Sequence, residues 1–529
     1  MTESTPGPLR VQTLTDETHR RALFARGYLL TTRDLEAGAE FPFFGNWARV
    51  RLGSWNLYTH CLTKHYCHSV NDVRILLVGH AYNPFTGQSD EEALLMTAAE
   101  ALGKSEQAFH ATMSEWTGRF IVVVIRGEEL LAVQDCAGMR TLFYAQVQGA
   151  PYLSSHAQLL SDLCGLEMTP WIGELVGSRE YKVGIRFLPG DASPFAEVKR
   201  LGPNTALTYR DGRFGVHRFY SPSTATEGGT EEEQAARIAR IAEILKTSLE
   251  ITSRKWGLPA ISLTGGTDSQ TTLAASVDSR ARLKFFTFAS NDEEAHDLRA
   301  AQDLAAHLEL DHSAYVVPQS EEAIPGYQEF AAVVQHNAAY VRANAANDLR
   351  KMAFFALNPP CEVDVKSWVS EIARSNFSKR LGMEKLPSPL SPRQMTILYK
   401  RIFFDRKLLR RVDSAFADWM QRVGFGGIEG VDDADMVYWE HRFPAWGGTV
   451  LSDFDMCWET TVPFNNRRLI EMMLGFPRHR RVDDYAHREV VKRLDPELAN
   501  RNVHVVNFSK QKLRVVVERL FFEINSRLP

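Results

Sequence analysis

Ser262-Leu-Thr-Gly-Gly-Thr-Asp-Ser269 joins an apolar run at residues 258–263 to an expected helix at 269–277. Consecutive glycines let the backbone approach a ligand closely and direct successive N–H groups at one point. The N-terminus of the following helix adds the positive end of its dipole. Polar side chains that suit phosphates and a cation are interleaved with the glycines: Thr264, Thr267, Asp268 and Ser269. The segment favours a site for an oligophosphate with its metal ion, although a tight turn with a capped helix would use the same residues.

Strands and helices alternate on both sides of this segment. The apolar runs predict strands at 258–263, 283–288 and 313–317, and the amphipathic stretches predict helices at 231–252, 269–277 and 295–308. Strands with two apolar faces between helices are typical of a parallel α/β sheet. Beyond about residue 320 the pattern is mostly helical.

The first 220 residues have a different, β-rich pattern. Short apolar runs at 74–80, 118–125 and 129–133 predict strands, and the last two predict a hairpin. A second hairpin is expected around the turn at 209–213, and helices are expected at 90–102 and 156–163. The small, polar and glycine-rich stretch at 221–230 is typical of a linker.

Composition limits the classes of function. The 529 residues are 44% hydrophobic and 24% charged with a net charge of −4, which fits a globular protein of two to four domains. This balance offers no basic field for nucleic acid or anionic membranes. Six cysteines, a polar N-terminus without signal-peptide character and the absence of an apolar run of about 20 residues lead us to expect a cytoplasmic protein.

Thr264–Ser269 resembles the pyrophosphate-binding loop of the asparagine synthetase and β-lactam synthetase family, Ser-Gly-Gly-X-Asp-Ser, with Thr264 in place of the first Ser. The following segments at 286–289, 291–294 and 308–312 resemble the family in order and spacing, and 462–470 resembles a later motif. Stretches in the first half resemble strands of the family's glutaminase-type domain: 115–120, 133–144, 152–156 and 202–204. The resemblance implies an Ntn-hydrolase-like αββα sandwich over residues 1–222, followed by a PP-loop synthetase domain with a parallel sheet and a helical C-terminal part over 231–529.

The resemblance also implies a set of site residues. The ATP-binding residues would be Ser262, Leu263, Thr264, Gly265, Gly266, Thr267, Asp268, Ser269, Phe288 and Ser367. Asp268 and Glu371 would bind Mg²⁺, with Glu371 in place of the family's second-loop Asp; an exposed helix carboxylate is the alternative for Glu371. Lys510 is the nearest match to the catalytic lysine, with Lys512 as second choice, and a solvated surface lysine is the alternative.

Four features depart from the family or stay open. Position 2 is Thr where glutamine-dependent members carry a Cys nucleophile, so ammonia from glutamine is not expected, as in the β-lactam and carbapenam synthetases and the lasso-peptide cyclases. Trp368 falls where relatives carry a Glu or Tyr, and indole cannot be a general base. Tyr438, Glu440 and Arg442 would line an acceptor pocket or pack a helix. The segment His60–His68 is rich in His and Cys, but its Cys spacing does not fit a structural zinc site.

We therefore expect an ATP-dependent enzyme that adenylates a substrate carboxylate, releases pyrophosphate, and joins the acyl group to an amine with release of AMP. Small-molecule or peptide acids and amines would be its substrates, in natural-product biosynthesis, by ring closure or by intermolecular amidation. Expected partners are a second copy or other biosynthetic enzymes, and neither nucleic acid nor a membrane. The alternatives are a catalytically inactive ATP-binding scaffold and another PP-loop chemistry such as tRNA thiolation, which would favour a basic surface and Cys pairs.

Overall fold

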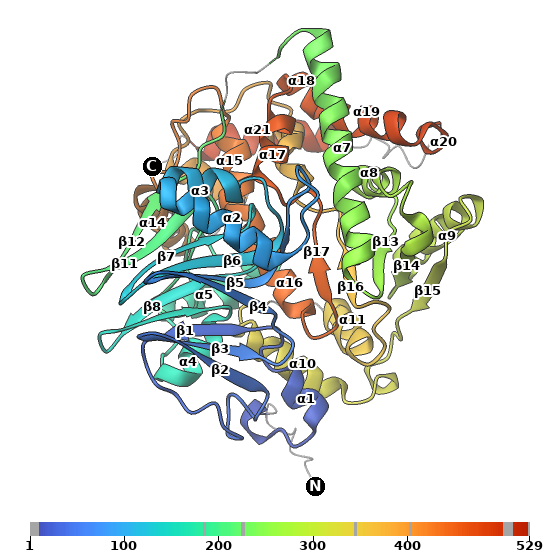
Figure 1. The fold of residues 1–529 in the computed structure, drawn as a ribbon. Coiled ribbons are helices and arrows are strands. Elements are labelled where there is room, and N and C mark those ends of the chain that lie inside the picture. Colours follow the sequence, from blue (N-terminus) through green and yellow to red (C-terminus); the bar gives the residue numbers. More distant parts are fainter. Residues whose placement is uncertain are drawn as a thin grey trace.

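Two six-stranded antiparallel sheets form the first half of the protein (Figure 1). The computed structural model describes residues 10–183, 187–223, 228–342, 346–400, 405–500 and 512–526. The first sheet has the order β10-β8-β9-β1-β3-β2, with β1 (Tyr28–Thr31), β2 (Trp47–Leu52), β3 (Trp55–His60), β8 (Phe143–Val147), β9 (Ala150–Ser154) and β10 (Val198–Arg200). The second has the order β12-β11-β7-β6-β5-β4, with β4 (His65–Val70), β5 (Val73–Tyr82), β6 (Thr117–Arg126), β7 (Glu129–Gln134), β11 (Thr205–Arg210) and β12 (Arg213–Arg218). Both predicted hairpins are confirmed, since β6 pairs with β7 and β11 with β12.

The two sheets pack face to face between helices. Leu30 and Leu57 of the first sheet share a buried cluster with Leu76 and Val123 of the second. The outer face of the second sheet is covered by α2 (Glu91–Lys104) and α3 (Glu106–Met113), and the outer face of the first by α1 (Glu17–Ala22) and α4 (Ala157–Cys164). This order of layers confirms the expected αββα sandwich.

A five-stranded parallel sheet follows, with the order β15-β14-β13-β16-β17. Its strands are β13 (Pro259–Ser262), β14 (Lys284–Ala289), β15 (His312–Val316), β16 (Val363–Val365) and β17 (Glu459–Thr461). The helices that alternate with the first three strands are α7 (Glu231–Lys255), α8 (Thr267–Ala275) and α9 (Asp292–His307). The predicted α/β sheet is confirmed. At its edge, β15 is largely exposed, so the expectation of two apolar faces is wrong for this strand.

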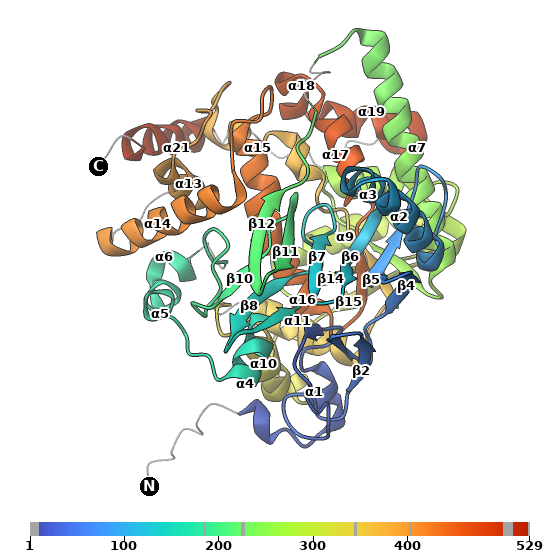
Figure 2. The same cartoon turned by 60° about the vertical axis from the view of Figure 1, so that its left-hand side comes forward.

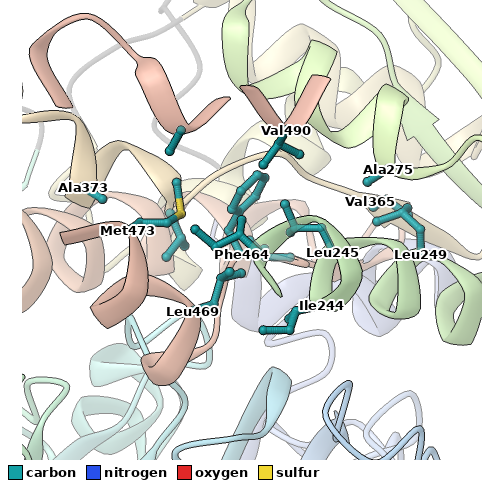
Figure 3. Packing of buried hydrophobic residues seen from close by; sticks show 14 of the residues in the cluster. Ile244, Leu245, Leu249, Ala275, Val365, Ala373, Phe464, Leu469, Met473 and Val490 are labelled. Atoms are coloured by element: carbon teal, nitrogen blue, oxygen red, sulfur yellow. The ribbon is translucent and has the colours of Figure 1, made fainter. Parts of the chain in front are cut away.

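The core of the second half forms where α7 packs against the parallel sheet. Figure 3 shows Ile244, Leu245 and Leu249 of α7 in one cluster with Val365 of β16 and Phe464. Fully burying such aliphatic side chains contributes about 1.5–3 kcal/mol each. Helix α7 begins at a capping box in which Thr230 and Glu233 satisfy each other's backbone N–H groups.

Helices dominate the chain after β15, as predicted, although β16 and β17 interrupt them. Figure 2 shows α13, α14 and α21 on one side of the molecule, where they share a buried cluster with α5 and α6. The remaining helices are α5 (Pro170–Gly177), α6 (Arg179–Lys182), α10 (Tyr327–Asn337), α11 (Ala346–Leu357), α12 (Asn376–Leu381), α13 (Pro392–Tyr399), α14 (Arg406–Val423), α15 (Asp433–Val437), α16 (Thr449–Phe454), α17 (Arg467–Leu474), α18 (Arg478–Val482), α19 (Tyr485–Leu494), α20 (Pro496–Ala499) and α21 (Lys512–Asn525). The 3₁₀ helices are η1 (Val11–Thr13), η2 (Arg280–Arg282), η3 (Glu321–Ala323) and η4 (Ser370–Arg374), and η5 (Tyr438–Gly448) is a π-helix.

Two further expectations concern the limits of the domains and the membrane. The predicted domains, 1–222 and 231–529, meet around residues 224–227, which lie outside the described residues, and these limits stay predictions. Within the described ranges, no helix combines the length and the apolar character needed to span a bilayer.

A buried ion network joins the sandwich to the parallel sheet. Arg119 of β6 binds Asp455 through two hydrogen bonds of 2.7 and 2.9 Å and donates a third, of 3.1 Å, to Glu459 at the start of β17. Arg140 donates to the second oxygen of Glu459 at 3.2 Å, and Arg26 lies 3.4 Å from it. Burial alone would raise the pKa of Glu459, but the charges of the arginines outweigh it and hold the pKa well below its usual range.

Replacing Glu459 with Gln should cost about 3–5 kcal/mol at pH 7, because three arginines lose a buried charged partner. Since the folded-state pKa lies far below the unfolded value of about 4.3, the contribution is complete above that unfolded pKa and is lost progressively as the pH falls towards the folded-state pKa. Urea titrations of wild type and Glu459→Gln should therefore differ most at pH 7, and the difference should be smaller at pH 3.5. Glu250→Gln, which removes an exposed helical ion pair with Arg254, is the control and should change stability by about 0.5 kcal/mol or less. Equal differences at both pH values would contradict this account.

Candidate active site

The loop between β13 and α8 leaves free space above its glycines. Gly266 is the N-cap of α8 and has an extended backbone with φ of −80°, which any residue could adopt. A Cβ atom at Gly266 would approach only Thr264 Oγ1, at 3.8 Å, so the protein itself does not require glycine here. The Thr264 N–H donates to Ser269 Oγ at 3.1 Å and fixes the curve of the loop. The loop therefore has the open, N–H-lined shape of an anion site at a helix N-terminus.

Asp268, in the first turn of α8, lies at the centre of a polar cluster. Ser370 and Arg374 of η4 donate to its two carboxylate oxygens, and His487 Nε2 of α19 lies 3.3 Å from Oδ1. Burial alone would raise the pKa of Asp268, but His487 and Arg374 outweigh it and keep the pKa well below its usual range. Asp268 is therefore ionised and held in one orientation, as a cation ligand needs to be.

Arg374 is fixed by a second carboxylate. Its Nε and Nη2 donate to Asp484 at 2.8 and 2.9 Å, and Lys379 of α12 donates to the same carboxylate. The sequence analysis missed Arg374, Lys379, Asp484 and His487, because no spacing or motif marks them. The result is a network of two cations and two carboxylates beside the loop between β13 and α8.

Glu371 lies on η4 between two of the residues that contact Asp268. Its Oε2 atom is buried and has no hydrogen-bond partner among the described residues. Burial and the nearby charge of Asp268 raise the pKa of Glu371 to about 8. The side chain is thus not the solvated helix carboxylate of the alternative interpretation. Two neighbouring carboxyl groups, one with an unsatisfied buried oxygen, fit a hard cation such as Mg²⁺, although the metal role of both residues stays a prediction.

A cavity of about 270 Å³ opens at the carboxyl ends of the parallel strands, and its lining includes Lys366 and Trp368 of the segment that precedes η4. Phe288, Lys366 and Trp368 line it, together with Trp446 and Trp458. Lys366 Nζ donates to Ser262 Oγ at 3.1 Å, which connects the cavity wall to the start of the loop. The buried Oγ of Ser367 has no partner among the described residues. Phe288 and Ser367 are the two residues outside the loop that were predicted to bind the nucleotide. Phe288 lines the cavity, and Ser367 lies in the chain between Lys366 and Trp368, which also line it.

Trp368 is part of the cavity wall. Its ring stacks on Trp446 of η5 with the centroids 4.9 Å apart and the planes at 29°. Carbon surface therefore replaces the polar side chain that the family resemblance places here, and the position offers no proton acceptor.

The other candidates lie elsewhere. Lys510 lies outside the described residues, and Lys512 begins α21. Glu440 is buried and accepts hydrogen bonds from Arg218 and Asn204 of the sandwich, and the described cavity lining contains neither Tyr438, Glu440 nor Arg442. Glu440 therefore connects η5 to the sandwich and does not line this cavity. The described segment 60–68 brings together no three metal ligands, and His60 Nδ1 instead accepts from the N–H groups of Arg26 and Leu62.

Residues 240–346 match the family model described as asparagine synthase. This region is therefore similar to asparagine synthase domains. The match includes the loop with Asp268 and Phe288, and it ends before Glu371. It therefore supports the family resemblance for this part of the chain.

Solved structures and curated proteins add little to this result. Similar chains include the allosteric regulatory enzyme of purine biosynthesis, with 9% identity, a TM-score of 0.25 and coverage of 60% of this chain and 88% of that one. The glutamine phosphoribosylpyrophosphate amidotransferase from B. subtilis, complexed with ADP and GMP, has 8% identity, a TM-score of 0.23 and the same coverage. No curated protein matches the chain.

Asp268→Asn should lower ATP-dependent pyrophosphate release by at least about 100-fold, because it removes an ionised oxygen ligand from the phosphate site. The carboxamide oxygen still accepts the Ser370 hydrogen bond and Arg374 keeps its pair with Asp484, so loss of the Arg374–Asp268 ion pair should lower the thermal midpoint without preventing folding. Asp278→Asn removes an exposed carboxylate paired with Lys246 and is the matched control. Pyrophosphate release near the wild-type rate in Asp268→Asn would rule out a metal-binding role for this carboxylate.

Proposed function

We propose that this protein is an ATP-dependent carbon–nitrogen ligase that activates a substrate carboxylate with release of pyrophosphate and joins it to an amine with release of AMP. The observation that carries the proposal is the pairing of ionised Asp268 with the unsatisfied buried oxygen of Glu371, beside the loop of the asparagine synthase domain. Glu371 has no purely structural explanation, since burying a polar atom without a partner costs free energy.

The residues around the loop have separate roles in this proposal. Backbone N–H groups of 265–269, at the N-terminus of α8, bind the phosphates of ATP, whereas the Thr264 N–H is used within the loop. Mg²⁺ held by Asp268 and Glu371 would stabilise the charge that develops on those phosphates. Arg374 and His487 keep Asp268 ionised and oriented, and Asp484 holds Arg374 in place. Arg374 and Lys379 also place cationic groups near the departing pyrophosphate, a role that the family resemblance assigned to Lys510, with Lys512 as second choice.

The acid substrate binds, in this proposal, in the cavity that Trp368 and Trp446 line. Lys366 is the cation of this wall that also contacts the loop, so it is suited to orient a carboxylate towards the α-phosphate of ATP. The stacked indoles favour a substrate with a broad apolar surface. Such a site suits a small-molecule or peptide acid of a natural-product pathway, with ring closure and intermolecular amidation both compatible.

The second candidate function is an ATP-binding scaffold without catalysis. It rests on Trp368, which fills the position of a polar residue in relatives and provides no base. An amine nucleophile that loses its proton to solvent or to a phosphate oxygen would need no such base, and for this reason we prefer the ligase.

Incubation with ATP, Mg²⁺ and a panel of apolar acids and amines tests the two candidates. A ligase should form AMP and pyrophosphate in equal amounts, with an amide product detectable by mass spectrometry, and should release no glutamate from glutamine. ATP binding without acid-dependent pyrophosphate release across the panel would favour the scaffold. Glutamate release that Thr2→Ala abolishes would contradict the assigned source of nitrogen.

Glu371→Gln retains the shape of the side chain and removes its charge, so it should reduce pyrophosphate release by about 100-fold or more. Thermal stability should change little, because the raised pKa leaves the metal-free carboxyl group largely protonated and the neutral carboxamide has nearly the same shape. Glu371→Asp should retain part of the activity, because the family pattern has Asp at this position. Glu497→Gln, at an exposed position beside His307, is the control. Wild-type turnover in Glu371→Gln would show that the second loop has been assigned to the wrong residues.

A further inference from the structure

Three potential metal ligands meet on the outer surface of the sandwich, away from the phosphate-binding loop. Glu106 and His110 lie four residues apart on α3 and therefore face the same side. His217 reaches the same point from the edge strand β12. One ligand atom from each of the three residues lies within 4.8 Å of the other two.

The distances within this cluster suit a metal better than they suit hydrogen bonds. Glu106 Oε1 lies 3.4 Å from His110 Nε2 and 3.5 Å from His217 Nε2. Charge-assisted hydrogen bonds are shorter, at about 2.7–2.9 Å. Bonds of about 2.0–2.1 Å to a tetrahedral Zn²⁺ ion separate neighbouring ligand atoms by about 3.3–3.4 Å. The carboxylate oxygen is thus already at the ligand–ligand spacing of a zinc site from both imidazoles.

Packing holds one of the imidazoles in place before any metal binds. His110 is buried, and its ring stacks on Phe219 with the centroids 4.3 Å apart and the planes at 25°. The Arg467 guanidinium lies over the same phenyl ring at 5.0 Å. Ordering a buried, stacked ligand costs little further entropy, so only the exposed His217 and Glu106 have to adjust.

We propose that Glu106, His110 and His217 bind a divalent transition-metal ion, Zn²⁺ foremost, with two imidazoles and one carboxylate as protein ligands. Two imidazoles with a carboxylate suit zinc, and three protein ligands leave the fourth tetrahedral position open. That position faces a surface cleft of about 330 Å³, which all three ligands line together with Tyr220 and Arg468 of α17. The metal would tie α3 to the edge strand β12, and the fourth position is open to water or a small anion.

Zinc and cobalt titrations of the full chain test this site. After dialysis against a chelator, wild type should bind one equivalent of Zn²⁺ that His217→Ala weakens by at least about 100-fold. Co²⁺ should give the intense visible absorption of a tetrahedral site in wild type, and this absorption should be absent from His217→Ala and Glu106→Gln. The exposed positions of His217 and Glu106 make both variants compatible with folding, which circular dichroism verifies.

His307→Ala is the matched control, because His307 forms an exposed pair with Glu497, at 2.6 Å, that has no second imidazole. It should retain the zinc equivalent and the cobalt spectrum. Wild-type affinity in His217→Ala, or no tetrahedral cobalt absorption in wild type, would overturn the proposal and leave two His–Glu contacts in its place.

Discussion

The arrangement of the two halves depends on one carboxylate, Glu459, and the three arginines around it. Arg26, Arg119 and Arg140 all come from the sandwich, whereas Glu459 begins β17, the edge strand of the parallel sheet. Buried charges tolerate little displacement, because each lost contact leaves a desolvated ion unpaired. The network therefore fixes β17 and the preceding α16 relative to the sandwich. Since α16 and β17 supply part of the cavity wall, the shape of the proposed substrate site follows from contacts far from the loop.

Local sequence signals predicted the parts of the fold that local interactions build. Both hairpins and the order of β13, α8, β14, α9 and β15 follow from runs of apolar residues and their spacing, whereas the αββα layers were implied by the family resemblance. The strands β16 and β17 were missed, because three residues in a helical region are too few for a periodic pattern. The loop itself was recognisable because its glycines, hydroxyls and aspartate are consecutive.

The surroundings of the loop were beyond prediction for a different reason. Arg374 binds Asp268 and Asp484, which are 106 and 110 residues away in sequence, and no local pattern reports such a pairing. The stacking of Trp368 on Trp446 likewise depends on how η5 folds back against the second loop. Sequence reasoning could name Trp368 as a departure from the family pattern, whereas only the structure reveals it as a wall of the cavity.

The π-helix η5 is eleven residues long and contacts both the sandwich and the cavity. Glu440, near its start, binds Arg218 of the sandwich, and Trp446, near its end, closes the cavity against Trp368. π-Helices are rare and usually occur as single turns within α-helices. Their i→i+5 hydrogen bonds enclose one more residue than those of an α-helix. Deletion of one residue would allow the segment to relax to an α-helix and would rotate Trp446 relative to Glu440. The number of residues between Glu440 and Trp446 is therefore constrained, in addition to the identity of the two residues. Insertions and deletions should be far less tolerated here than in the hairpin turns of the sandwich.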